Sequence, residues 1–221
     1  TTEIYTLSLH DALPISTVAG PIEKEGPLGK YFDNTYEDLY CECKTFEQAE
    51  QKMLKEAVDT VFKKTKLYEK DIDIMFGGDL LNQITSCSYV SRDYKIPLIG
   101  TFGACSSSML TLALASSYVN AGYASRAMAF TSSHNATAER QYRYPTEYGV
   151  QKPETTTYTA TGAGAIIVSN EKSDIRVTSA TIGEVVDYEF NDANNMGVAM
   201  APAAYKTMSQ HFKDLNRDPS L

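Results

Sequence analysis

The stretch TFGACSSS at residues 101–108 marks an abrupt change in the sequence pattern. A strand-like segment, PLIG at residues 97–100, ends just before it, and an apolar run from Met109 to Val119 begins just after it. Cys105 is therefore expected where a strand turns into a buried helix. The first turn of a helix has unpaired backbone N–H groups and a partial positive charge. Both favour a thiolate or an anionic ligand. We expect acyl chemistry or anion binding at this turn.

Strand and helix patterns alternate along the rest of the chain. Strands are predicted at residues 71–78, 97–102, 126–131, 161–168 and 175–186, with the last two paired to each other. A helix is predicted from the N-cap Thr45 to residue 66, and further helices are predicted at residues 80–94, 106–122 and 200–215. Residues 132–153 are polar and are predicted to form a functional loop. This order predicts an α/β layered fold with a mixed, mostly parallel sheet and a buried central helix.

The composition limits the classes of function that the chain can have. The 221 residues include 43% hydrophobic and 22% charged residues, as in ordinary globular proteins, and the net charge is −8. An acidic chain lacks the basic face that nucleic-acid binding needs, so nucleic acid is excluded as a general partner. The four cysteines have no zinc-binding spacing, which predicts a reducing, intracellular compartment. No apolar run approaches the ~18 residues of a transmembrane helix.

The first sixteen residues, TTEIYTLSLHDALPIS, differ in character from the sequence that follows. They resemble a translated sequencing adaptor, and we expect residues 1–16 to be non-native and residues 17–221 to form the domain. The alternative is a native first strand, because residues 3–9 alternate weakly between polar and apolar.

Polar groups follow three of the predicted strands: Asp79, Cys105, and the pair His134 and Asn135. Ligands of α/β proteins bind at the carboxyl ends of the strands, so these groups are expected to converge. Each also has a structural interpretation. Cys105 would then be a small buried apolar residue, and His134 a histidine of the core. Asp79 would be the N-cap of a helix from Leu80, and for Asp79 the local sequence favours this structural role.

Several longer motifs resemble those of a known family. They are AGPIEKEGPLG (19–29), GGDLLNQ (77–83), FGACSSSM (102–109), TSSHNATAERQYRYPTEYG (131–149), and MAPAAY with HFKDLNR within 200–217. Together they resemble the stage V sporulation protein AD family of the thiolase-like superfamily, over residues 17–221. The resemblance implies the N-terminal half of the thiolase-like fold, with the C-terminal half missing. It also implies a spore protein that binds dipicolinic acid (pyridine-2,6-dicarboxylate) for uptake into the forespore.

Two departures weaken a catalytic interpretation of this resemblance. Condensing enzymes of the superfamily take a catalytic histidine from the second half, which this sequence does not contain. The glycine-rich strand also reads TGAG at residues 161–164, where ketosynthases have DGAG. We therefore expect a binding protein and no enzyme. The alternatives are a condensing enzyme with Cys105 as the acyl-accepting nucleophile, or a structural relic used for protein–protein contact.

A flat aromatic dianion needs hydrogen-bond donors or cations for two carboxylates, and apolar walls. The expected ligand-binding residues are Asp79, Cys105, His134, Asn135, Arg140 and Arg143. The expected walls are Phe102, Tyr142 and Tyr144. Asp79 would orient a neighbour or hold a calcium ion bound with the ligand, and the two arginines would bind carboxylates or brace the loop against Glu139 and Glu147. No other cofactor is expected.

The resemblance also implies partners and a location. We expect peripheral attachment to the inner membrane of the forespore or spore through other stage V sporulation membrane proteins of the same uptake channel. Thiolase-like proteins dimerise through their first half, so a homodimer is expected.

Overall fold

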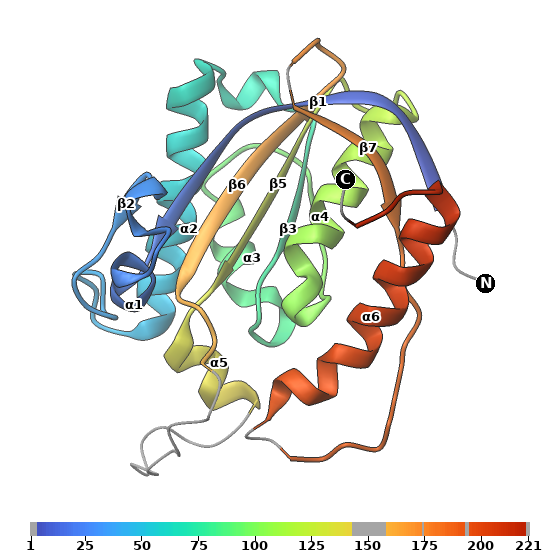
Figure 1. Cartoon of the computed structure of the whole chain (residues 1–221). Coiled ribbons are helices and arrows are strands. Elements are labelled where there is room, and N and C mark those ends of the chain that lie inside the picture. The colour runs from blue at the N-terminus through green and yellow to red at the C-terminus, as the bar shows by residue number, and fades with distance from the viewer. Residues whose placement is uncertain (1–3, 143–157, 174, 193–194, 220–221) are drawn as a thin grey trace.

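The computed structural model describes residues 4–142, 158–173, 175–192 and 195–219. In this part of the chain a seven-stranded mixed sheet lies between helices (Figure 1). The strands are β1 (Ile4–Ala19), β2 (Asn34–Thr35), β3 (Ile74–Gly78), β4 (Leu98–Gly100), β5 (Arg126–Ser133), β6 (Gly162–Ser169) and β7 (Arg176–Thr181). The helices are α1 (Pro21–Glu25), α2 (Phe46–Thr65), α3 (Thr85–Ser91), α4 (Ser107–Asn120), α5 (Asn135–Tyr142) and α6 (Met196–Leu215). The expected α/β layered architecture is confirmed.

The strand order is β2-β1-β6-β5-β3-β4, and β7 pairs with β1 beyond the end of β6. β4, β3 and β5 run parallel to one another, so their carboxyl ends lie at one edge. β6 runs antiparallel to both β5 and β1. The predicted pairing of β6 with β7 is therefore wrong: each pairs with β1, because β1 is long enough to contact both in succession.

Alternate residues of the central strands point to opposite faces of the sheet, as strand geometry requires. Met75 and Met128 pack in one apolar cluster with α2 and α3, and Phe76 and Ala129 pack in the other with α4. All four side chains are buried. The sheet is thus the middle layer, with α2 and α3 on one face and α4 on the other, and each helix position follows from the period-two pattern of β3 and β5.

Two helices, α2 and α4, begin and end within two residues of the predicted bounds, and α6 begins at Met196, four residues before its predicted start. Thr45 caps α2 by accepting the backbone N–H of Gln48 at 3.2 Å, and Lys66 ends it in the left-handed conformation with φ of 57°. α3 is shorter than predicted because a 3₁₀ turn at Asn82–Ile84 precedes it. Residues 135–142 form α5, so the prediction of a loop there is wrong; alanine, glutamate, arginine and glutamine within them favour a helix.

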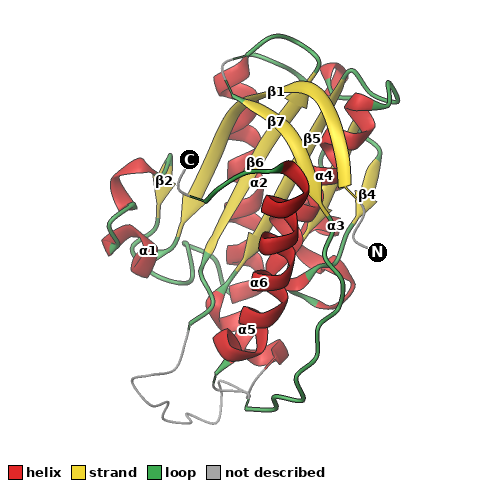
Figure 2. Cartoon of the chain, turned by 45° about the vertical axis from the view of Figure 1, so that its right-hand side comes forward, coloured by secondary structure: helices red, strands yellow, loops and turns green. Residues whose placement is uncertain are grey.

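The first half of β1 pairs with β7, a strand from late in the chain. Residues 4–16, which the sequence analysis predicts to be non-native, are included in β1, and their origin stays a prediction. α6 lies beside β7 (Figure 2), where Thr181 Oγ1 and His211 Nδ1 are 2.8 Å apart. The outer side of α6 exposes Tyr205 and Met208. Among the described residues, every helix is too short or too polar to cross a lipid bilayer.

The core of the α2 layer provides a direct test of this packing. Met53 of α2 has no exposed surface, so Met53→Ala should leave a cavity and lower the free energy of unfolding by about 2–5 kcal/mol. Met109 of α4 is 62% exposed, so Met109→Ala is the matched control and should change stability by less than about 0.5 kcal/mol. Chemical denaturation measures both, and equal effects would contradict the packing.

Candidate functional site

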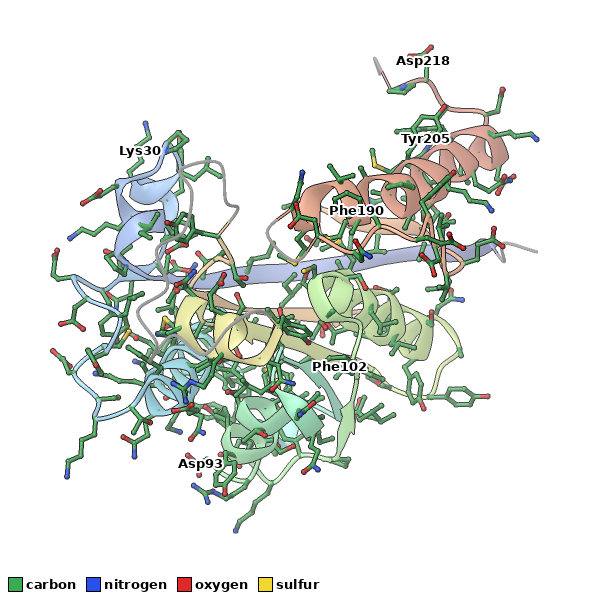
Figure 3. The ribbon with its side chains drawn as sticks, turned by 90° about the horizontal axis from the view of Figure 1, so that it is seen from below. Lys30, Asp93, Phe102, Phe190, Tyr205 and Asp218 are labelled. Carbon is green, nitrogen blue, oxygen red and sulfur yellow. The ribbon has the colours of Figure 1, made fainter. Side chains whose placement is uncertain are left out.

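Three strand ends and two helix starts meet at one edge of the sheet. β3, β4 and β5 end there, α4 and α5 begin there, and Figure 3 looks onto this edge. The chain from β4 to α4 passes close to the end of β3: a Cβ added to Gly78 would lie 2.8 Å from the backbone oxygen of Thr101. Glycine is required at residue 78 because this approach leaves no room for a side chain.

Cys105 lies on a sharp turn between β4 and α4, as the sequence predicts. Ala104, immediately before it, has φ of 47°, a left-handed conformation that is costly for any residue with a Cβ. The turn is held by hydrogen bonds from the Ser106 hydroxyl to Gly103 O at 2.7 Å and from Gly103 N–H to the Ser107 hydroxyl at 3.2 Å. The result is an exposed Cys105 thiol at the amino end of α4.

Apolar side chains surround this turn. Phe102, labelled in Figure 3, is 55% exposed, and Met109 in the first turns of α4 is also exposed. Tyr142 approaches from the last residue of α5. Burial raises the pKa of the Tyr142 hydroxyl, and the nearby Cys105 thiol and Asp79 carboxyl raise it further. Phe102 and Tyr142, two of the predicted walls, therefore lie at the turn, whereas Tyr144 is outside the described residues.

Asp79 is fully buried beneath this turn. Its carboxylate accepts the backbone N–H of Leu81 at 2.9 Å and that of Cys87 at 2.8 Å. Burial raises the pKa of Asp79, and the backbone donors oppose that shift. Both oxygens thus orient the segment between β3 and α3. The prediction of Asp79 as the N-cap of a helix from Leu80 is wrong, because the 3₁₀ turn begins at Asn82 and α3 at Thr85, and neither has a side-chain cap.

His134 and Asn135 connect β5 and α5 to neighbouring loops. The ring Nε2 of His134 lies 2.7 Å from Leu39 O, and Nδ1 accepts the backbone N–H of Ala136 at 3.2 Å. Since Nδ1 accepts, Nε2 carries the proton and donates it to Leu39. Burial lowers the pKa of His134, which keeps the ring neutral. Asn135 donates its side-chain amide to Thr159 O at 3.1 Å.

Arg140 of α5 forms an ion pair with Glu47 of α2 at 2.8 Å, a partner that the sequence analysis, which named Glu139 and Glu147, did not predict. Arg143 lies outside the described residues. Of the predicted ligand residues, Cys105 and Asp79 lie close enough to Tyr142 to raise the pKa of its hydroxyl. Two other predicted ligand residues, His134 and Asn135, bond to backbone oxygens, and their role toward a ligand stays a prediction.

The sequence analysis missed Glu50, a carboxylate with almost no exposed surface. It lies in α2 at helical spacing from Phe46 and Met53, so a charged residue on the apolar face of this helix was the signal. Ser132 Oγ donates to Glu50 Oε1 at 2.9 Å, and Thr137 Oγ1 lies 2.9 Å from Oε2. These contacts connect α2 with the end of β5 and the first turn of α5.

Burial raises the pKa of Glu50 to about 7, and the nearby Asp79 carboxylate adds to the shift. Burial above all, and then the same two carboxylates, hold the pKa of the Cys87 thiol well above its usual range. The described residues contain no group of three or more histidine, cysteine, aspartate or glutamate side chains placed to hold a metal ion. The buried acidic groups are thus arranged for hydrogen bonding within the protein.

The raised pKa of Glu50 predicts how stability changes with pH. The folded protein keeps a proton on Glu50 up to about pH 7, whereas the unfolded chain releases it near its ordinary pKa of 4.5. Between these values the folded state binds more protons, so the free energy of unfolding should decrease as pH rises, by about 2–3 kcal/mol in all.

Glu50→Gln should remove this decrease, because the amide stays neutral at every pH. Glu47→Gln, one turn away on the same helix and partly exposed, should keep it. Urea denaturation between about pH 5 and about pH 8 measures the three proteins, and parallel curves for wild type and Glu50→Gln would contradict the assignment.

Comparison with known proteins places this geometry in a family. Residues 6–221 match the family described as Stage V sporulation protein AD. Stage V sporulation protein AD of Bacillus subtilis (strain 168) is 55% identical over 201 residues, which are 91% of this chain and 60% of that protein. The chain therefore spans about 60% of the length of this curated relative.

Solved structures with low sequence identity share the fold. A variant of OleA of Xanthomonas campestris, bound with cerulenin, has a TM-score of 0.64 at 11% identity, over 96% of this chain and 72% of that one. 3-Oxoacyl-(acyl-carrier-protein) synthase III of Aquifex aeolicus has a TM-score of 0.50 at 14% identity, over 74% and 55%. The fold is thiolase-like, and the chain belongs to the stage V sporulation protein AD family.

Proposed function

We propose that this protein binds dipicolinic acid, a flat aromatic dianion, at the turn around Cys105, and that it does so without chemical turnover. The observation that carries the proposal is the exposed turn at the amino end of α4, with apolar Phe102 and Tyr142 beside it. In the cell, binding would serve uptake of dipicolinate into the forespore together with stage V sporulation membrane proteins.

The turn supplies the two kinds of contact that this ligand needs. Backbone N–H groups at a helix start can donate to a carboxylate without a buried positive charge. At this turn the N–H groups of Ser106 and Ser107 already bond to Gly103 O and Ala104 O, so the donors in this proposal are other N–H groups of the turn and of the first turn of α4. Aromatic faces of Phe102 and Tyr142 match the flat pyridine ring. Arg140 lies on α5, two residues before Tyr142, with its guanidinium paired to Glu47, and its contact with a ligand carboxylate stays a prediction.

Asp79 and His134 have a different part in this proposal. Their oxygen and nitrogen atoms bond to backbone groups, so they position the strand ends and contribute no direct contact to the ligand. The Asp79 carboxyl group is buried near the turn, and calcium bound with the ligand would offset the repulsion between a charged Asp79 and a dianion.

One observation favours a second candidate, a condensing enzyme acylated on Cys105. A thiol held on a strained turn at a helix start, with backbone N–H groups beside it, matches the geometry of a nucleophile next to an oxyanion hole. Binding without turnover and acylation predict different products, so one set of variants distinguishes them.

The experiment is calorimetric titration of dipicolinate, with and without calcium, into the protein at its full natural length. Tyr142→Ala should weaken binding about tenfold through the lost aromatic wall, and Cys105→Ala should weaken it a few-fold. Tyr123→Ala and Cys43→Ala are the matched controls, because Tyr123 lies exposed just beyond the other end of α4 and Cys43 precedes α2.

Saturable binding that both site variants weaken and both controls retain would support the proposal. Absence of heat with wild-type protein at any concentration would contradict it. A covalent acyl group on Cys105 after incubation with an acyl-coenzyme A thioester, detected by mass spectrometry and lost in Cys105→Ala, would favour the enzyme instead.

A further inference from the structure

Three consecutive serines follow Cys105, and their hydroxyl groups have different surroundings. Ser106 Oγ donates to Gly103 O at 2.7 Å, and Ser107 Oγ accepts the Gly103 N–H at 3.2 Å. These two hydroxyls hold the turn. Ser108 is exposed, and within the part of the chain that the structure describes its hydroxyl has no hydrogen-bond partner. One hydroxyl group of the three is therefore available to a ligand.

Ser108 shares a face of the helix with Cys105. Side chains three residues apart in a helix lie on the same face, with about 5–6 Å between their Cβ atoms. Cys105 is exposed, and Met109, the residue after Ser108, is 62% exposed. Ser107 and Thr111, on the opposite side of these turns, are buried. The face of α4 that carries Ser108 is thus the face that a ligand at Cys105 would meet.

A dianion at this turn needs a donor from a side chain. The backbone N–H groups of Ser106 and Ser107 already bond to carbonyl oxygens of the turn. The guanidinium of Arg140 on α5 is paired with Glu47. A hydroxyl group that donates to a carboxylate forms a charge-assisted hydrogen bond, which is shorter and stronger than a neutral one. A free hydroxyl on the exposed face of α4 meets this need without an added charge.

We propose that Ser108 is a ligand-binding residue of this site, which donates its hydroxyl hydrogen to one carboxylate of the dianion while the other carboxylate lies at the turn beside Cys105. The spacing agrees, because two carboxyl groups in a 1,3 relation on a six-membered ring are about as far apart as neighbouring side chains on one helix face. This inference rests on the proposed function and names the side chain that binds the second carboxylate.

The test is calorimetric titration of dipicolinate into the protein at its full natural length. Ser108→Ala should weaken binding about tenfold or more, which is the cost of one hydrogen bond to a charged group. Ser108→Thr keeps the hydroxyl and should bind within a few-fold of wild type. Ser125→Ala is the matched control, since Ser125 is also exposed but lies beyond the other end of α4.

Thermal unfolding separates contact with the ligand from a structural role. Without ligand, Ser108→Ala should keep the wild-type Tm, because its hydroxyl holds no other described group, whereas Ser106→Ala should lower Tm through loss of the bond to Gly103 O. Dipicolinate at one fixed concentration should raise the Tm of wild type and Ser125→Ala more than that of Ser108→Ala. A Tm that falls as far in Ser108→Ala as in Ser106→Ala would overturn the inference.

The outcomes distinguish this inference from the function on which it rests. Saturable binding by wild type that Ser108→Ala leaves unchanged would overturn the role of Ser108 and leave dipicolinate binding intact. Equal weakening by Ser108→Ala and Ser108→Thr would also overturn it, since the hydroxyl would then not be the group that binds. Absence of binding by wild type would contradict the proposed function and this inference with it.

Discussion

A carboxyl group that is cut off from water must either keep its proton or be surrounded by donors, and Glu50 satisfies this constraint by connecting three elements. The hydroxyl groups of Ser132 and Thr137 meet it from the end of β5 and the start of α5. An apolar side chain at this position would remove the partner of the Ser132 hydroxyl, whereas Thr137 would keep the backbone oxygen of His134. Glu50 thus joins α2, β5 and α5 inside the core, and the Arg140–Glu47 ion pair joins α2 to α5 at the surface.

The groups at the strand ends divide into a buried frame and an exposed surface. Asp79 and His134 have their polar atoms bonded to backbone groups, which fixes the loops after β3 and β5. Cys105 and Phe102 are exposed on the turn that these loops support. Rigid support below and accessible groups above are what a preorganised binding site requires, since ordering of the site then costs little when the ligand binds.

The sequence predicts the features that depend on local pattern. The α2 cap at Thr45, the strand–turn–helix around Cys105 and the layered α/β order all follow from spacing and turn residues. The pairing of β6 and β7 with β1 was not predictable, because strand partners distant in the chain depend on strand length and packing. A polar composition suggested a loop where α5 forms, and the partners of Glu50 became visible only when three elements were placed together.

The pairing of β1 has a consequence for how the chain reaches its fold. Val18 and Ala19 lie near the amino end, yet they pair with Ala163 and Gly162, which are synthesised far later. During translation the edge of β1 that pairs with β6 therefore stays unpaired until β6 has left the ribosome. Contacts so distant in sequence slow folding and prolong the exposure of an unpaired edge to other chains.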